Sequence, residues 1–349
     1  MPSRTTTAIG RLSLLGAASV VAVSGACRSP EPTRTAERTV TIYVSTDRVF
    51  SEPVLREYER RSGVRVSVAY DTEETKSTGL ANRLLAEKNR PQADVFWSNE
   101  PVRTLVLKSR DVLASYRSPS AVGIPASLVD PDGYWTGFSA RIRVIAYNTK
   151  LVTQDEAPRS VFDLADPKWK GQVAIADPRF GSTSFHVAAL YVLLGDAKAD
   201  ELFRRLKANE VRFVNSNSTV RDLVVRGEVK VGLTDTDDVN VALENGDPVA
   251  MVLPDRDGLG VPVMPNMVSL VADAPHADEG RKLIDYLVSP DVERQLAESA
   301  AVQIPLHAGV PGPKNLPAIG SFKPMTLDYS GAASRVEDVT ARLASMLGL

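Results

Sequence analysis

The sequence predicts an α/β fold. Short apolar runs with strand character alternate along the chain with segments in which apolar residues recur at helical spacing. Short polar side chains follow most of these apolar runs, at the point where the next helix would begin. This alternation is typical of strands and helices that succeed one another around a mostly parallel sheet.

The elements follow one another in a regular order. Residues 40–44 form an apolar run typical of a buried strand, and a helical period runs from about Glu52 to Arg61, where Gly63 would end the helix. Residues 64–70 alternate as a second strand, and a helix is expected at 79–88. Further strands, with helices between them, are predicted at 93–97, 143–147, 173–175, 211–214, 229–233, 249–253 and 268–271.

Composition excludes several function classes. The length of 349 residues suggests two domains at roughly 150 residues each. The near balance of 41 Lys and Arg against 43 Asp and Glu gives no basic surface for a nucleic acid. The single cysteine excludes a disulfide framework and zinc sites built on paired thiolates.

The first residues have the composition of an export signal. Two arginines accompany an uncharged apolar run at 12–23, which is shorter than the roughly 20 residues that span a bilayer. Residues 1–26 are therefore predicted to be a signal peptide. The small residues before Cys27 resemble a lipobox, in which that thiol is lipidated, although Ser24 departs from the usual Leu or Val; the alternative is a plain cleaved signal. Residues 27–39 are polar and are expected to form a tether.

Six polar segments follow predicted strands and together favour a ligand cleft. In open α/β sheets, ligands bind beyond the carboxyl ends of the strands, where helix N-termini present free N–H groups. Each segment alone is explained by helix capping, and it is their number that favours a cleft. They are 45–47, 71–73, 98–100, 181–184, 215–217 and 234–238.

Five further stretches carry information through their order and spacing: residues 41–47, 91–100, 139–149, 163–171 and 303–306. In that order and spacing they resemble the ferric-type periplasmic solute-binding proteins of bacterial ABC importers.

The resemblance extends over essentially the whole chain after the signal. It implies a type II periplasmic binding protein fold with two α/β lobes and a two-strand hinge near 141–147 and 260–267. Lobe 1 would comprise 40–141 plus 265–349, and lobe 2 would comprise 142–264.

The resemblance also implies a role and a location. The protein would be an exported monomer in the periplasm or on the outer face of the cell membrane, held there only by its lipid anchor. It would have an ABC permease as its partner and no catalytic cofactor.

Four acids occupy or adjoin the positions that hold iron in such proteins. Where iron-binding members have two adjacent tyrosines, this chain has Asp237 and Asp238; Asp47 stands at the histidine position, and Asn99 with Glu100 beside it stands at the glutamate position. The resemblance therefore assigns Asp47, Glu100, Asp237 and Asp238 as metal ligands. Carboxylates are hard donors that suit ferric iron, Mg, Ca or Mn. An organic ammonium, including a thiamine-like cation, would suit the same acids.

A second half-site suits an anion. Residues 181–184 and 215–219 match the segments in which iron-binding relatives hold a synergistic phosphate or carbonate, and helix N-termini favour such ions. A phosphorylated or phosphonate solute is therefore the alternative ligand. Arg141 or Arg143 would add a guanidinium, although both could be structural ion-pair partners, and His186 is expected in the core. The predicted ligand-binding residues are Ser45, Thr46, Trp97, Asn99, Arg141, Gly181, Ser182, Thr183, Ser184, Asn215, Ser216, Asn217 and Asp235.

One motif suggests an enzyme instead. Residues 231–239 match the strand and DxDxV pattern of haloacid-dehalogenase-type phosphatases, with Asp235 as nucleophile and Asp237 as acid/base. That motif normally opens its domain, whereas here it follows two thirds of the chain, and short motifs match by chance. A binding protein is therefore expected rather than a phosphatase.

Overall fold

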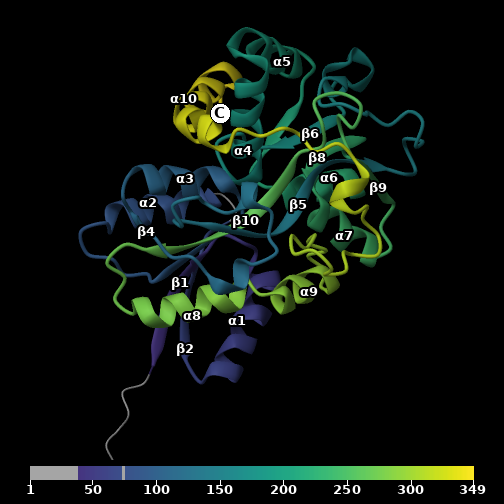
Figure 1. Cartoon of the computed structure of the whole chain (residues 1–349). Coiled ribbons are helices and arrows are strands. Elements are labelled where there is room, and N and C mark those ends of the chain that lie inside the picture. The colour runs from purple at the N-terminus through teal and green to yellow at the C-terminus, as the bar shows by residue number, and fades with distance from the viewer. Residues whose placement is uncertain (1–37, 73–74) are drawn as a thin grey trace, which may run out of the picture. The chain divides into compact units, whose positions relative to one another are not determined.

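The computed structural model describes residues 38–72 and 75–349. The predicted signal peptide, Cys27 and nearly all of the tether lie outside these residues. Within the described part, helices cover a mixed sheet of ten strands (Figure 1), which confirms the α/β prediction. None of the described helices has the length and apolar character that crossing a membrane requires.

The predicted strands are present, and most ends shift by one or two residues, but those predicted at 143–147 and 268–271 begin seven and five residues earlier. The strands are β1 (Thr39–Val44), β2 (Arg65–Tyr70), β3 (Val95–Ser98), β4 (Leu113–Ala114), β5 (Thr136–Asn148), β6 (Val173–Ala176), β7 (Arg212–Val214), β8 (Val231–Asp235), β9 (Val249–Val252) and β10 (Val263–Val271). The α-helices are α1 (Arg48–Ser62), α2 (Thr78–Ala86), α3 (Pro101–Ser109), α4 (Gly181–Leu194), α5 (Asp196–Ala208), α6 (Asn217–Val225), α7 (Thr236–Glu244), α8 (Ala277–Leu287), α9 (Pro290–Glu298) and α10 (Tyr329–Leu347).

The first helix illustrates which signals predict a boundary. Helix α1 ends as expected, because Gly63 adopts a left-handed φ of 66° and its N–H bonds to the carbonyl of Glu59 at 2.9 Å. Its start lies earlier than predicted: the helix begins at Arg48 and continues through Pro53. Proline removes a backbone hydrogen bond and disfavours the interior of a helix. Here the buried contacts of Val54 and Leu55 keep the segment helical.

The sheet is mixed, so the expectation of a mostly parallel sheet is wrong at its centre. The strand order is β2-β1-β3-β10-β5-β8-β6-β7, with β4 on β10 and β9 on β5. The outer pairs are parallel, but β5 and β10 run antiparallel to all their partners. The reason is topological: β5 carries the chain from one half of the sheet to the other, and β10 brings it back.

The long strand β5 joins the two halves of the sheet. Its first part pairs with β10, up to Ile142 opposite Val263, and its second part pairs with β8 from Arg143 opposite Asp235. All 13 of its residues are buried. Arg141 and Arg143 are therefore placed at the junction, pointing to the same face because alternate residues of a strand share one.

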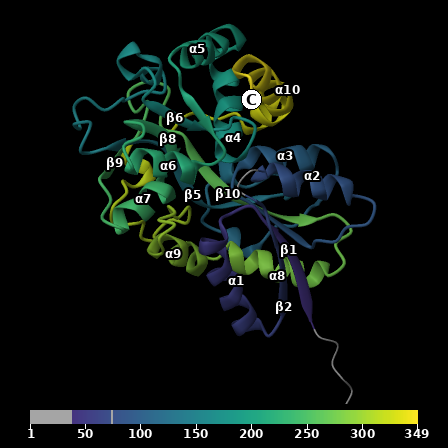
Figure 2. The ribbon, with the colours of Figure 1, turned by 180° about the vertical axis from the view of Figure 1, so that it is seen from behind.

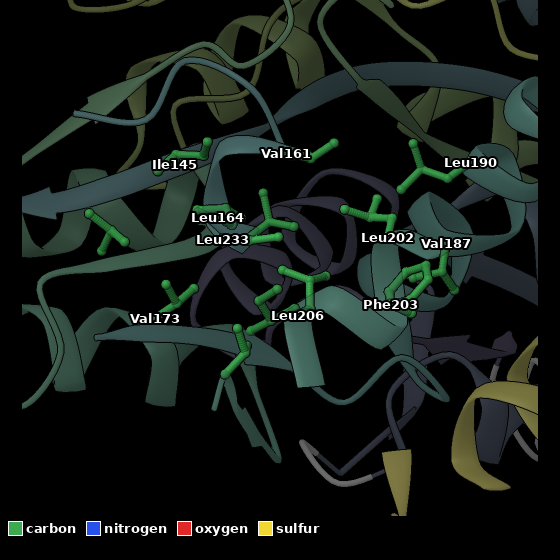
Figure 3. Packing of buried hydrophobic residues seen from close by; sticks show 14 of the residues in the cluster. Ile145, Val161, Leu164, Val173, Val187, Leu190, Leu202, Phe203, Leu206 and Leu233 are labelled. Atoms are coloured by element: carbon green, nitrogen blue, oxygen red, sulfur yellow. The ribbon is translucent and has the colours of Figure 1, made fainter. Parts of the chain in front are cut away.

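Two main apolar cores flank this junction. In one, strands β1 and β3 pack with α1 and α8; in the other, α4 and α5 pack against β5, β6 and β8. Figure 3 shows the second core, in which Leu190 of α4 and Leu202 and Phe203 of α5 lie in one cluster with Leu233 of β8. Helix α10 lies beside both α3 and α4 (Figure 2), and Leu343 belongs to the second core.

Gly260, just before β10, is expected to tolerate no side chain. It has a φ of +96°, and a Cβ would lie 2.6 Å from the carbonyl oxygen of Pro324. Gly246, with a φ of +75° and no atom within 4 Å of the place where a Cβ would lie, is the matched control. Gly246→Ala should cost roughly 1 kcal/mol from the φ angle alone, and Gly260→Ala about 2 kcal/mol more. Urea unfolding of both variants checks this, and equal losses would contradict it.

Candidate functional site

A small cavity lies at the carboxyl ends of β1, β3, β6 and β8, where polar residues begin the next helices. Its volume of about 30 Å³ leaves room for an ion or two waters. The residues that line it are Asp47, Lys76, Asn99, Arg141, Ala176, Asp177, Phe180, Gly181, Ser182, Thr183, Asn215, Ser216, Asn217, Ser218, Asp235 and Asp238. Most of the predicted ligand-binding residues are therefore brought together.

Arg143 and Asp235 form the buried centre of one wall. The Arg143 guanidinium is fully buried and donates to Asp235 Oδ1 and Asn217 Oδ1, both at 2.9 Å. It also donates to Ser182 Oγ and Thr183 Oγ1, each at 3.2 Å. Ser182 Oγ in turn donates to Asp235 Oδ2 at 2.6 Å. This network ties the N-termini of α4 and α6 to the end of β8.

The charge of Asp235 is compensated by these arginines. Burial by itself would raise the pKa of Asp235, but the guanidiniums of Arg143 and Arg141 outweigh burial and hold that pKa below its usual value. Asp235 is therefore an anion at neutral pH, and its two oxygens are occupied by hydrogen bonds. It holds the site together more than it faces a ligand.

Arg141 connects the two halves of the sheet across the cavity. Its Nη1 donates to Asp237 Oδ2 at 3.2 Å, and its Nη2 donates to the carbonyl of Asn99 at 2.8 Å. Burial lowers the pKa of Arg141, but the nearby Asp237 and Asp235 carboxylates raise it further, so the net shift is upward. The guanidinium stays charged while it bridges the end of β3 and the start of α7.

Three aspartates converge at the start of α7. One oxygen from each of Asp235, Asp237 and Asp238 lies within 4.8 Å of the others. Among the residues that the structure describes, Asp237 Oδ1 and Asn99 Oδ1 are buried and have no hydrogen-bond partner. Burial, and then repulsion from Asp237 and Asp235, raises the pKa of Asp238 to about 7. These are hard oxygen donors, and Asp237 and Asn99 each keep one oxygen free of hydrogen bonds from the described residues, an arrangement that suits a cation.

Lys76 enters the same cavity from the turn before α2. Its ammonium forms an ion pair with Asp47 Oδ1, and its carbonyl accepts from Gly181 N–H at 3.0 Å, at the start of α4. Burial lowers the pKa of Lys76 to about 8, against the raising effect of Asp238. The chain thus places a cation of its own beside the carboxylates.

Besides Asp237, five of the predicted ligand-binding and metal-binding residues do not line the cavity. The Glu100 carboxylate caps α3, accepting from Val102 N–H at 2.6 Å and Arg103 N–H at 3.0 Å. Trp97 is fully buried against Phe138, with ring centroids 5.3 Å apart.

The other three are buried hydroxyl residues that bond away from the cavity. Ser45 donates to Asp71, Thr46 donates to Asn266, and Ser184 donates to the carbonyl of Gly181. Asp237 is not part of the lining, but it contacts Arg141 and belongs to the aspartate cluster. His186 is buried, and burial lowers its pKa to about 3, so it is a neutral core residue.

Sequence reasoning missed Lys76 and Asp177. Asp177 directly follows β6, so the rule of polar residues at strand ends would have found it. Lys76 lies five positions beyond Asp71, in a turn that no periodic pattern places, and only the contact of this turn with Gly181 brings it to the cavity.

Asp71, which directly follows β2, is expected to make stability depend on pH. Burial raises its pKa from 3.8 to about 6, partly offset by hydrogen bonds from Ser45 and the Leu80 N–H. Because the folded pKa is the higher one, the stabilisation is complete below pH 3.8 and is lost as the pH rises through about 6. Asparagine does not titrate, so Asp71→Asn does not lose this stabilisation as the pH rises. The free energy of unfolding of the variant, relative to that of wild type, should therefore increase between pH 4 and 7. Urea unfolding at both pH values measures this, and a constant difference would contradict it.

Comparison with known proteins gives the family. The family model for bacterial extracellular solute-binding proteins matches residues 91–330. Iron uptake protein A1 of Synechocystis sp. is 28% identical over 309 residues, covering 85% of this chain and 84% of that protein. The major ferric iron-binding protein of Neisseria meningitidis serogroup B is 24% identical over 294 residues, covering 81% and 86%.

A solved structure agrees with these sequence matches. The Trichodesmium protein (IdiA, FutA) in complex with iron and citrate ligands matches with a TM-score of 0.74 and 25% identity, covering 89% of this chain and 99% of that one. The two-lobed α/β fold and the sequence match over most of the chain lead to one conclusion: this chain belongs to the bacterial extracellular solute-binding proteins.

Proposed function

We propose that this protein captures a hard metal cation, ferric iron, between its two lobes and delivers it to an ABC permease. The lobes would be 40–141 plus 265–349 and 142–264, with β5 and β10 as the hinge. The observation that carries the proposal is the aspartate cluster, where Asp237 Oδ1 and the neighbouring Asn99 Oδ1 are buried without a hydrogen-bond partner in the described part of the chain. Unused buried oxygens are costly unless a ligand meets them.

The ligand set follows from which carboxylate oxygens already accept hydrogen bonds: both oxygens of Asp235 do, whereas Asp237 uses only Oδ2, for Arg141. Asp235 is paired with Arg143 and would support the site from behind. Asp237 and Asp238 would coordinate the cation from one lobe, and Asp47 with Asn99 from the other. Such a set consists of oxygen donors only and includes no phenolate, and it suits ferric iron as a hard cation. Three relatives point to the same cargo, because their names or structures involve iron.

A synergistic anion would complete the coordination. The N-termini of α4 and α6 meet at the cavity, where Ser182, Asn217 and Ser216 offer polar groups. Helix N-termini favour anions, and the Trichodesmium relative holds citrate together with iron. Binding of the cation and anion across both lobes would stabilise the closed form, which the permease would recognise.

The proposal includes a location outside the cytoplasm and a role without catalysis. The protein would be exported and anchored through a lipid on Cys27, which keeps it near the permease. As a carrier it would perform no catalysis. Turnover of a phosphate ester by the purified protein that Asp235→Asn abolishes would contradict this part of the proposal.

Thermal melting with a panel of ligands tests the cargo. Ferric citrate is expected to raise the melting temperature, while citrate alone and Mg²⁺ produce smaller shifts, because only a ligand bound to the native state stabilises it. Metal analysis of protein expressed in iron-containing medium should find iron in the purified protein. The absence of both iron and a ferric citrate shift would refute the proposal.

A phosphorylated or phosphonate solute is the second candidate. It is favoured by Arg141 and by the starts of α4 and α6, which line the cavity, since guanidinium and N–H groups recognise phosphoryl oxygens. The present cavity, about 30 Å³, would have to open for such a ligand. Melting shifts with 2-aminoethylphosphonate or fructose 6-phosphate in metal-free buffer would favour this candidate over ferric iron.

A further inference from the structure

Lys76 supplies the aspartate cluster with a positive charge from within the protein. Its ammonium is ion-paired with Asp47, and it lines the cavity together with Asp238 and Asp235. The Lys76 side chain is only 17% exposed. Burial lowers the pKa of Lys76, and the carboxylates of Asp238, Asp237 and Asp235 oppose that shift.

The main chain delivers this lysine to the cavity. The Lys76 carbonyl accepts a hydrogen bond from Gly181 N–H at 3.0 Å, so the turn that carries it is fixed to the start of α4. Thr78 Oγ1 adds a bond to the carbonyl of Arg179 at 3.5 Å. Two hydrogen bonds thus fix this backbone to the segment at the start of α4. The ammonium, by contrast, sits on a flexible four-carbon stem and can move while the backbone stays in place.

We propose that Lys76 is a built-in counter-ion that occupies the cation's place beside Asp47 and Asp238 and that an incoming metal ion must displace. The inference rests on the proposed cation-binding function and identifies the residue that sets its affinity and charge preference. While no metal ion is bound, the ammonium compensates the negative charge of the carboxylates and so reduces the repulsion between them. A metal ion binds only if its attraction to the carboxylates exceeds that of the ammonium it replaces.

The inference predicts a dependence on cation charge. The displaced ammonium stays tethered to its fixed turn, and Coulomb energy is proportional to the product of the charges, so its residual repulsion of a bound cation is larger for a trivalent ion than for a divalent one. Removing the ammonium should therefore strengthen ferric iron binding more than Mn²⁺ binding. A purely structural role of Lys76 would change both affinities in the same proportion or weaken both.

Titration of three variants tests the inference. Lys76→Met removes the charge and keeps most of the stem, Lys76→Arg keeps the charge, and Lys150→Met is the matched control at an exposed position outside the cavity lining. Ferric nitrilotriacetate, which keeps ferric iron in solution, and Mn²⁺ serve as probes in calorimetric titrations at pH 7. Melting curves of the metal-free proteins show whether each variant is folded.

Lys76→Met is expected to bind ferric iron on the order of tenfold more tightly than wild type or more, with a smaller gain for Mn²⁺. Lys76→Arg and Lys150→Met should each stay close to wild type. Metal-free Lys76→Met should melt at a lower temperature than wild type, because its carboxylates lack their counter-ion. Added iron should raise its melting temperature by more than it raises that of wild type.

Other results would overturn the inference. If wild type binds iron and Lys76→Met binds it equally or more weakly, then the lysine is not displaced and serves the ligand or the fold instead, while the proposed function stands. If neither wild type nor Lys76→Met binds either metal, the cation-binding function fails together with the inference. Iron binding by Lys76→Met alone would support the inference most strongly.

Discussion

An Asp237→Asn variant is expected to lose affinity for ferric iron by on the order of 100-fold or more, while remaining folded. Asp237 Oδ1 is a buried carboxylate oxygen of the cluster with no hydrogen-bond partner among the described residues, so this oxygen is available to a cation while Oδ2 accepts from Arg141. Asparagine keeps the size of the side chain and an oxygen for Arg141. The loss should therefore appear in binding rather than in stability.

Asp177→Asn is the control for this loss. Asp177 also lines the cavity, but its carboxylate is held by the Arg179 guanidinium and backbone N–H, so neutralising it should reduce iron affinity by less than about threefold. Calorimetric titration with ferric nitrilotriacetate measures both variants. Similar losses in the two variants would mean that the cavity responds to total charge and that the aspartate cluster has no special role.

Arg143→Met is expected to destabilise the protein by about 3–5 kcal/mol, because it leaves the buried Asp235 carboxylate without its main partner. The substitution also removes donors to Ser182, Thr183 and Asn217, which hold the starts of α4 and α6. Urea unfolding monitored by tryptophan fluorescence measures the loss.

The matched test is a double-mutant cycle with Asp235→Asn. If the cost arises from an unpaired buried charge, the Arg143→Met, Asp235→Asn double variant should be more stable than Arg143→Met alone. Strictly additive losses would instead assign the cost to packing and would remove Asp235 from its supporting role.

Most of the fold could be predicted from the sequence, because the spacing of apolar residues and the polar residues after strands both depend on local structure. Runs such as 40–44 and 173–175 correspond to β1 and β6, and Gly63 ends α1 as expected. The direction of β5 and β10 was not predictable in this way. An apolar run has the same pattern whether its strand is parallel or antiparallel to its neighbours. Only the resemblance to a two-lobed family indicated strands that cross between the halves.

The candidate site was predictable as a region but not in its details. The rule of polar residues after strands indicated Asp47, Asn99 and Asp235 because strand ends are a local feature. It could not distinguish Glu100, whose carboxylate caps α3, from a carboxylate that faces the cavity, because both follow the same strand. Lys76 depends on a contact between two turns more than 100 positions apart, with Gly181, and no local pattern reports such a contact.

Anomalous diffraction at the iron absorption edge, from crystals grown with ferric citrate, tests the central claim most directly. The account predicts a strong peak between Asp237 and Asp238, within coordination distance of Asn99 or Asp47, with the Lys76 ammonium moved away. A cavity that holds only an oxyanion against Arg141 and the α4 and α6 N-termini, with no anomalous peak at the aspartate cluster, would contradict the account.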